Sequence, residues 1–372
     1  SCASSTMALV RALLLLPLLK VACAAPPRWN ELTAEYSYEQ YIKDFRKESG
    51  GVEGQQRFER NLAGILAHNS KAGVSFRRGV NQWTDTAPAL GRKVPGDASS
   101  HKLTAPQHVP ADILSLALED LPAQVDWRDQ GVVSPVKNQG HCGSCWAFAT
   151  TATVESHIAL STGLLFSLSP EQLVACAPND DHCGGTGGCQ GSIPELAYDY
   201  LIQEGGFAEE WSYPYQSYGG RTTICKNVTT TVAGISGYVK LPENNASAVM
   251  AALATVGPLA INVDASNWHD YESGVYDGCS YDEMEIDHVV VLVGYGTDEE
   301  TGEDYWLVRN SWSPTWGESG YIRLKRDPVN STPCGVDNNP QDGTGCDNAT
   351  VQYPCGMCGT IFDVSYPTGA FV

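Results

Sequence analysis

The chain has 372 residues, of which 23 are Lys or Arg and 43 are Asp or Glu, so its formal net charge is −20. Its length and its 42% of hydrophobic residues allow one large domain or two ordinary ones to bury a core, which excludes a disordered polymer. Nucleic acid is excluded as a partner, because an acidic surface repels phosphate.

The charge is distributed unevenly along the chain. Residues 27–120 contain 12 basic and 12 acidic residues, whereas residues 121–372 contain 9 and 31, a net charge of −22. A balanced segment therefore precedes a strongly acidic one. This arrangement fits a covering segment bound to an acidic core, and it also fits two unrelated surfaces.

Residues 7–24 are predicted to be a secretory signal peptide. Met7 and Arg11 precede an apolar run, and small residues follow it with the spacing needed for cleavage after Ala24. The run is too short to cross a bilayer, and no later stretch reaches about 18 uninterrupted apolar residues, so no membrane span is expected. We therefore expect the secretory pathway, with the lumen of a lysosome or vacuole, or the extracellular space, as the destination.

Export changes how the cysteines are interpreted, because cysteines persist as disulfides in an oxidising compartment. Cys2 and Cys23 fall before the predicted cleavage site, so 11 of the 13 cysteines remain. An odd number in an exported protein predicts that one cysteine stays outside the disulfides.

Two helices are predicted after the signal peptide. Apolar residues recur at helical spacing over residues 30–48 until two glycines stop the run, and they recur again over residues 58–73. Residues 74–108 are rich in Gly, Pro and Ser and are predicted to be irregular. The composition changes at Leu121, which we take as the start of a second domain.

Helices come first and strands afterwards in residues 121–372. A long helix is predicted from Cys145 to Thr162, ended by Gly163, and two shorter ones follow, one capped by Ser169 and one over residues 193–202. This order predicts an α+β fold of two packed subdomains, one mainly helical and one mainly β. Short runs rich in Val, Ile, Leu and aromatic residues predict the strands, over residues 259–263, 289–293, 304–309 and 320–324.

Three separated motifs carry the chemistry. They are Gln139-Gly-His-Cys-Gly-Ser-Cys-Trp146, then Asp287-His288 at the start of a Val-rich strand, then Asn310-Ser-Trp312. In this order they resemble the motifs of papain-like cysteine proteases, and of the cathepsin L type in particular. The resemblance covers nearly all of residues 121–372.

The resemblance implies a preproenzyme. Its fold would be papain-like, with a mainly helical subdomain over residues 121–231 and a β-barrel-like subdomain over residues 232–372, preceded by a helical inhibitory pro-domain over residues 25–120. It implies a cysteine endopeptidase made as an inhibited zymogen, which acts on proteins and peptides at acid pH as a monomer, without metal or organic cofactor. The absence of a long His-bearing insertion between Cys176 and Cys189 favours an endopeptidase over a carboxydipeptidase.

The resemblance also implies the catalytic roles. Cys145 would be the nucleophile, because a helix start and a neighbouring imidazolium, His288, both stabilise a thiolate. The Gln139 side chain and the Cys145 amide would bind the oxyanion. Asn310 would orient the imidazole, and Trp312 would shield that contact.

Other interpretations of these residues remain open from the sequence. Cys145 could be half of a disulfide, Cys142 and Cys145 could form a redox pair, and both could bind zinc together with Cys355 and Cys358. None of these explains Gln139, His288 and Asn310. Glu155 on the same helix is more typical of a satisfied core group than of a catalytic acid. A catalytically silent, peptide-binding relative and an inhibitor that acts through its pro-region alone are the rival functions.

The resemblance implies three disulfides, which are Cys142–Cys189, Cys176–Cys225 and Cys279–Cys358. Four further cysteines allow three connectivities: they are Cys183, Cys334, Cys346 and Cys355. The last three lie in residues 327–357, which are longer than the family's usual end and are predicted to be a disulfide-pinned surface loop.

The pro-region also resembles its family counterpart. Residues 79–85 match one of its motifs, whereas Gly50 and Gly54 stand where Arg and Glu are expected in the other, a helical motif. This segment would run backwards through the cleft and block it. Protonation of carboxylates such as Asp85 would loosen it at acid pH and allow self-cleavage near Leu121. The helical motif is matched by Phe58, Asn61, Ile65 and Asn69.

The pocket for the second residue before the cut is implied to accept apolar side chains such as Leu, Val or Phe. At its floor stands Asp363, and we hypothesise that its carboxylate also admits Arg or Lys. The alternative is that Asp363 points to solvent. The pocket residues are Ile193, Pro194, Ala265, Ile286, Val289 and Asp363. Sequons, which permit N-glycosylation in a secretory chain, begin at Asn227, Asn245, Asn330 and Asn348.

Overall fold

The computed structural model describes residues 25–86, 106–180, 182–345 and 350–372. The predicted signal peptide, Cys346 and the sequon at Asn348 lie outside the described residues. In the part that is described, no helix is long and apolar enough to cross a membrane.

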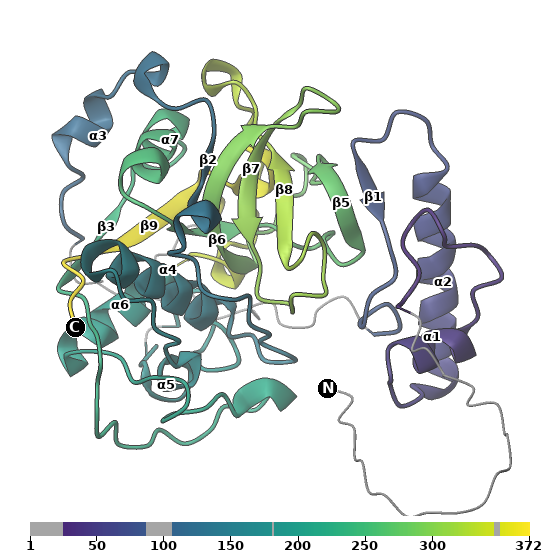
Figure 1. Ribbon diagram of the computed structural model, residues 1–372, viewed down its shortest axis with the longest axis horizontal. Helices are drawn as coiled ribbons and strands as arrows, with labels where there is room; N and C mark the ends of the chain where they lie inside the picture. The colour runs from purple at the N-terminus through teal and green to yellow at the C-terminus, as the bar shows by residue number, and fades with distance from the viewer. Residues whose placement is uncertain (1–24, 87–105, 181, 346–349) are drawn as a thin grey trace, which may run out of the picture.

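The pro-region contains two packed helices, α1 (Tyr38–Asp44) and α2 (Gly51–Asn69). Figure 1 shows them at one side of the molecule. α1 is shorter than the predicted 30–48, because the Ser37 hydroxyl caps it by accepting from the Gln40 amide at 3.2 Å. The glycine pair separates the helices as expected, but Gly51 already belongs to α2. The two helices bury a small apolar cluster that includes Tyr41, Phe58 and Ile65.

The segment predicted to be irregular begins with a strand. β1 (Phe76–Arg78) pairs antiparallel with β5 (Tyr271–Tyr276), and the ring of Phe76 lies 4.6 Å from that of Tyr276. The composition of residues 74–108 did not indicate this strand, because the strand that pairs with it lies almost 200 residues away in the chain. The pro-region is therefore joined to the second domain by main-chain hydrogen bonds at a sheet edge.

Residues 106–120 are also docked on the second domain. They form α3 (Ala111–Ser115) and a 3-10 turn, η1 (Leu118–Asp120), and Ile113 is buried in the core of the β half. The Gln107 amide donates to the Tyr238 carbonyl at 2.8 Å. Figure 1 shows α3 beside α7, on the opposite side of the molecule from α1 and α2.

The first half of the second domain is helical. Its central helix is α4 (Cys145–Thr162), which ends at Gly163 with φ 76° as the sequence predicts. Its first 15 residues are all buried, so α4 is a core helix packed on every side. The other elements are η2 (Trp127–Gln130), α5 (Pro170–Cys176), α6 (Pro194–Glu204) and η3 (Ser217–Gly219).

The second half is built on one sheet. Its described strands follow the order β1-β5-β8-β7-β6-β4-β9-β3, with β2 on β6, and β5 with β8 is the parallel pair among them. The strands are β2 (Val125–Asp126), β3 (Gly237–Lys240), β4 (Leu259–Val263), β6 (His288–Thr297), β7 (Asp304–Arg309), β8 (Tyr321–Lys325) and β9 (Asp363–Thr368). The helical elements are α7 (Ala246–Thr255), η4 (Val329–Ser331), η5 (Pro340–Asp342) and η6 (Met357–Gly359).

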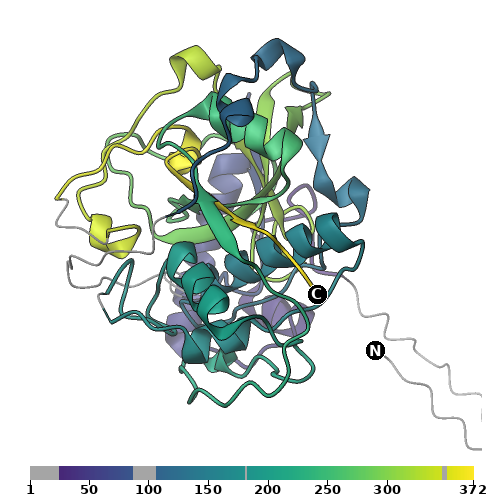
Figure 2. The ribbon, with the colours of Figure 1, turned by 90° about the vertical axis from the view of Figure 1, so that its left-hand side faces the viewer.

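β6 separates two apolar cores. Val289, Val291 and Val293 face the core built around α4, whereas Val290 and Leu292 face the core of the β half. The alternation is the period of two expected of a strand buried on both faces. Figure 2 shows the helices of the first half below the green strands of the second. The predicted α+β fold of two packed halves is thus confirmed.

Candidate active site

Cys145 is the first residue of α4 and is completely buried. Among the described residues it is the one cysteine outside a disulfide. The N-cap residue, Ser144, makes no side-chain cap, and its hydroxyl lies 2.9 Å from the Tyr215 hydroxyl instead. The amides of the first turn and the helix dipole therefore favour a negative charge on this sulfur.

His288 is the first residue of β6, opposite Val263 of β4. Its ring lies 4.8 Å from the ring of Trp312 and 6.3 Å from that of Trp268, measured between centroids. The imidazole is completely buried and Trp312 is 7% exposed, so the aromatic side chains screen the ring from water.

Asn310 fixes the tautomer of His288. The Asn310 side-chain oxygen accepts from the Ser311 amide at 2.7 Å, which settles which amide atom is the oxygen. The same oxygen lies 2.9 Å from His288 Nε2. Because an amide oxygen only accepts, Nε2 must carry the proton, and proton exchange with a thiol falls to Nδ1.

The loop before Cys145 is held by its own polar contacts. The main-chain N–H of Gln139 donates to the Ser311 carbonyl at 2.9 Å, and the Tyr215 hydroxyl donates to the main-chain carbonyl of Gln139 at 2.8 Å. The Gln139 side chain donates through Nε2 to the Cys142 carbonyl at 3.0 Å and accepts from the Ser311 hydroxyl. Sequence reasoning missed Tyr215 and Ser311, which tie Gln139 to Ser144 and Asn310.

Comparison with known proteins decides the family. The sequence profile of the papain family cysteine protease matches residues 121–344, more than half of the chain.

The chain belongs to the papain family of cysteine proteases.

Its relatives include plant and insect proteins. It is 40% identical to the oryzain beta chain of rice, Oryza sativa subsp. japonica, over 74% of this chain and 58% of the rice protein, so it spans less than two thirds of that relative. It is 38% identical to cathepsin L of the fly Sarcophaga peregrina over 75% of this chain and 82% of that protein. A solved structure of digestive procathepsin L2 from Tenebrio molitor covers 91% of this chain with a TM-score of 0.73 and 32% identity, and all of that chain is matched.

The three disulfides implied by the papain family are present in the structure, as Cys142–Cys189, Cys176–Cys225 and Cys279–Cys358. The structure adds Cys334–Cys355, which the sequence left open, and Cys183 is disulfide-bonded as well.

The redox and zinc interpretations are wrong. Cys142, Cys355 and Cys358 are each bonded to a cysteine outside their own C-x-x-C pair. Within the described ranges, no group of three or more His, Cys, Asp or Glu side chains is arranged to hold a metal ion.

Glu155 is a satisfied core group, as the sequence indicates. Its carboxylate accepts from the Ser134 hydroxyl, from Lys137 Nζ at 3.0 Å and from the Leu168 amide at 2.7 Å. These contacts hold α4 to the segments on either side of it.

The predicted pocket residues come from four places in the papain-family fold. Ile193 and Pro194 open α6, and both are buried. Ala265 follows β4, and its amide donates to the Asp287 carboxylate at 2.9 Å. Ile286 and Val289 flank Asp287 and His288 and are completely buried. The four apolar residues other than Pro194 each belong to a different apolar cluster.

Asp363 is buried, so the alternative that it points to solvent is wrong. It stands opposite Asn262 of β4, which in turn stands opposite Val289 of β6. Lys240 Nζ lies 3.1 Å from the Asp363 carboxylate and 3.5 Å from that of Glu195. Burial alone would lower the pKa of Lys240, but attraction by the two carboxylates outweighs burial and raises it. Lys240 could not be predicted to join this site, because the three residues are far apart in the chain.

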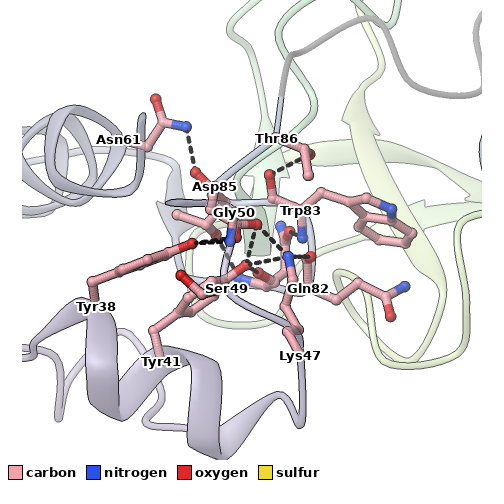
Figure 3. A network of polar contacts seen from close by, with 12 residues as sticks. Tyr38, Tyr41, Lys47, Ser49, Gly50, Asn61, Gln82, Trp83, Asp85 and Thr86 are labelled. Carbon is pink, nitrogen blue, oxygen red and sulfur yellow. Dashed lines mark hydrogen bonds and ion pairs between the residues drawn. The ribbon is translucent and has the colours of Figure 1, made fainter. Parts of the chain in front are cut away.

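Asp85 in the pro-region is the centre of a buried polar network (Figure 3). Its carboxylate forms an ion pair with Lys47 and accepts from the Tyr38 and Tyr41 hydroxyls, each at 3.1 Å. Lys47 Nζ also donates to the Gln82 carbonyl at 2.5 Å. The network holds the loop that contains the motif of residues 79–85 against the two helices of the pro-region.

Gly50 and Gly54 make room for this network. A Cβ atom on Gly54 would lie 2.7 Å from the Tyr38 hydroxyl, and the Gly50 amide donates to the same hydroxyl at 2.8 Å. The papain-family motif leads one to expect Arg and Glu side chains at these two glycines. In this chain the Tyr38 hydroxyl and the Lys47 ammonium lie beside Asp85 instead. The sequence pointed only to the missing side chains.

The pro-region also contacts the segment that precedes β5. The Asn81 side chain donates to the His269 carbonyl at 2.6 Å, next to Trp268, and the Gly79 amide donates to the Asp270 carbonyl at 2.9 Å. Arg28 forms an ion pair with Glu272 at 2.7 Å, although burial outweighs this attraction and raises the pKa of Glu272. The pro-region therefore binds close to the aromatic wall of His288.

The sequons differ in accessibility. Asn227 and Asn330 are exposed, whereas Asn245 is the N-cap of α7 and its side-chain oxygen accepts from the Ala248 amide at 3.0 Å. Of the three sequons that the structure describes, Asn227 and Asn330 are therefore the ones accessible to an enzyme that adds sugar.

Proposed function

We propose that this papain-family chain is the zymogen of a cysteine endopeptidase that hydrolyses peptide bonds through Cys145 and His288. The observation that carries the proposal is the combination of a buried thiol at the start of α4 with an imidazole whose Nε2 proton is held by Asn310.

The proposed reaction is acyl transfer. Cys145 loses its proton to His288 Nδ1, and the thiolate attacks the substrate carbonyl. The Gln139 side chain and the Cys145 amide bind the oxyanion, and one such donor contributes about 3 kcal/mol in other acyl-transfer enzymes. His288 then protonates the leaving amine, and water hydrolyses the thioester. Asn310 and Trp312 keep the imidazole oriented and dry throughout.

We propose that the pro-domain comprises residues 25–120 and inhibits the mature domain, residues 121–372, by lying through its cleft. The pairing of β1 with β5 and the contacts to His269 and Asp270 support this. The signal peptide supports passage through the secretory pathway to an acidic lumen or to the outside, where self-cleavage near Leu121 would release the enzyme.

Labelling with a thiol-directed epoxide tests the proposed function. After incubation of the full chain at about pH 5, we expect stoichiometric labelling of Cys145, because a paired thiolate survives there whereas an ordinary cysteine with a pKa of about 8.5 does not. The label is located by peptide mass spectrometry. His288→Ala should lose the labelling. Equal labelling of both proteins would contradict the ion pair, and no labelling of the wild type would favour the catalytically silent relative.

For the second residue before the cut we propose an apolar preference. The buried residues Ile193, Ile286 and Val289 support it. Lys240 already neutralises the Asp363 carboxylate, which argues against acceptance of Arg or Lys in the wild type.

Removing Lys240 should therefore uncover the basic preference that the sequence indicated. In Lys240→Met the ratio of kcat/KM for an Arg substrate to that for a Leu substrate is expected to rise about tenfold, because a guanidinium pairs with the vacated carboxylate. The second change Asp363→Ala should abolish the rise, and Lys325→Met on β8 is the matched control. An unchanged Arg/Leu ratio in Lys240→Met would show that Asp363 does not face the substrate side chain in the pocket.

A further inference from the structure

The described parts of the predicted surface loop, residues 327–345 and 350–357, are held by a disulfide and by main-chain hydrogen bonds, and the papain-family match ends within them, at residue 344. The disulfide Cys334–Cys355 closes the base of the loop, and Asp337 exchanges main-chain hydrogen bonds with Gln352, both at 2.9 Å. We call residues 334–345 the strap. It leaves the base of the loop, passes through η5 and reaches Gly343.

The strap is attached to the loop that leads into His288. The Val336 amide donates to the Tyr281 carbonyl, and the Met284 amide donates to the Val336 carbonyl, both at 3.1 Å. Asp337 is 1% exposed, and its carboxylate accepts from the Ile286 amide at 3.3 Å. The strap therefore holds the backbone of Ile286, two residues before His288.

The far end of the strap meets the helical half. Gly343 is packed so closely on Ile286 that a Cβ atom there would lie 2.9 Å from the Ile286 Cβ and still closer to its carbonyl oxygen. A Cβ atom on Gly184 would collide with the Gly343 carbonyl and lie 2.8 Å from Ile193 Cγ2. Gly184 is fixed in turn, because its neighbour Cys183 is disulfide-bonded.

Gly343 thus links the two walls of the predicted pocket by way of Gly184. Ile193 is contributed by the helical half and Ile286 by the β half; the backbone of Gly343 packs on Ile286, and that of Gly184 packs between Gly343 and Ile193. Close-packed backbone does not yield as a flexible side chain does, so the separation of these walls is set by the strap.

We propose that the strap is a specificity-determining element which closes the pocket for the second residue before the cut and restricts it to short apolar side chains, Val or Ala rather than Phe. The proposal rests on the proposed function. A longer side chain has to displace the Gly343 backbone together with the Asp337 contact that holds Ile286.

Gly343→Ala tests the proposal. The φ angle of Gly343 is −123°, outside the left-handed region, so the added methyl is expected to act through its bulk. The methyl should push the strap away from Ile286 and open the pocket. The full chain is activated by acid incubation, and kcat/KM is measured for two peptides that differ only in Phe or Val at the second position. The Phe/Val ratio is expected to be below one in the wild type and to rise at least about fivefold in Gly343→Ala.

Two further variants make the result decisive. Asp337→Asn loosens the hold on Ile286 without adding bulk and should raise the Phe/Val ratio in the same direction, which covers a failure of Gly343→Ala to fold. Gly219→Ala is the matched control, because a methyl there meets nothing within 4 Å, and its ratio should equal that of the wild type.

The outcomes separate the two proposals. A wild type that hydrolyses Phe and Val peptides equally well, or an unchanged ratio in the folded strap variants, overturns the strap and leaves the endopeptidase standing. A wild type that hydrolyses neither peptide after acid incubation overturns the proposed function and the strap with it.

Discussion

Cys145→Ala is expected to lower the peptidase activity that the full chain develops after acid incubation by about four orders of magnitude or more. In the proposed mechanism the sulfur is the nucleophile that the helix start and His288 activate, and alanine has no group that can replace it. Oxyanion binding by Gln139 gives no covalent path on its own. The measurement is hydrolysis of a fluorogenic peptide, together with the persistence of the uncut chain on a denaturing gel.

Ser161→Ala, at the other end of the same helix, is the control and should process and hydrolyse normally. Its hydroxyl bonds only to the carbonyls of Ile158 and Ala370, far along α4 from the candidate site. Activity within tenfold of the wild type in Cys145→Ala would show that another residue is the nucleophile.

Lys47→Met is expected to destabilise the pro-region by about 3 kcal/mol, because it leaves the Asp85 carboxylate buried without its cation. The side chain of Asp85 is only 3% exposed, so water does not replace the ammonium. Self-processing should then become faster and extend to higher pH. Unfolding is measured in the Cys145→Ala background, which keeps the chain uncut, and processing is followed on gels in the otherwise wild-type chain.

Lys43→Met, an exposed lysine in the last turn of α1, is the matched control. Asp85→Asn removes the other charge of the same ion pair and should speed self-processing in the same direction as Lys47→Met. Self-processing that keeps the wild-type rate in both variants would exclude this network as the contact that holds the pro-region in place.

The elements and residues that sequence reasoning identified are those with local signals. The helix from Cys145 is marked by the αL glycine at Gly163, and β6 by a run of valines. His288 and Asn310 were recognised because they lie in short motifs, and the structure brings their side chains to 2.9 Å. Local patterns suffice wherever the partner of a residue lies nearby or belongs to a known motif.

The remainder depends on contacts between distant residues. Phe76 lies in a strand because its segment pairs with β5, and Ile113 is buried because it packs on α7 and the residues around it. In the sequence, nothing distinguishes Lys47 and Lys240 from surface lysines, and only the fold places a carboxylate beside each of them. No periodicity in the chain records such pairs, which is why neither lysine was predicted to lie beside a buried carboxylate.

The disulfide Cys142–Cys189 stands three residues before the nucleophile, and the carbonyl of Cys142 accepts from the Gln139 side chain. Reductant added to an assay to regenerate the Cys145 thiol therefore has a second target in the same loop, where its action would loosen Gln139, the proposed oxyanion donor. The two effects oppose each other. The thiol concentration that gives the highest rate consequently reports on the strength of that bridge as much as on the oxidation state of Cys145.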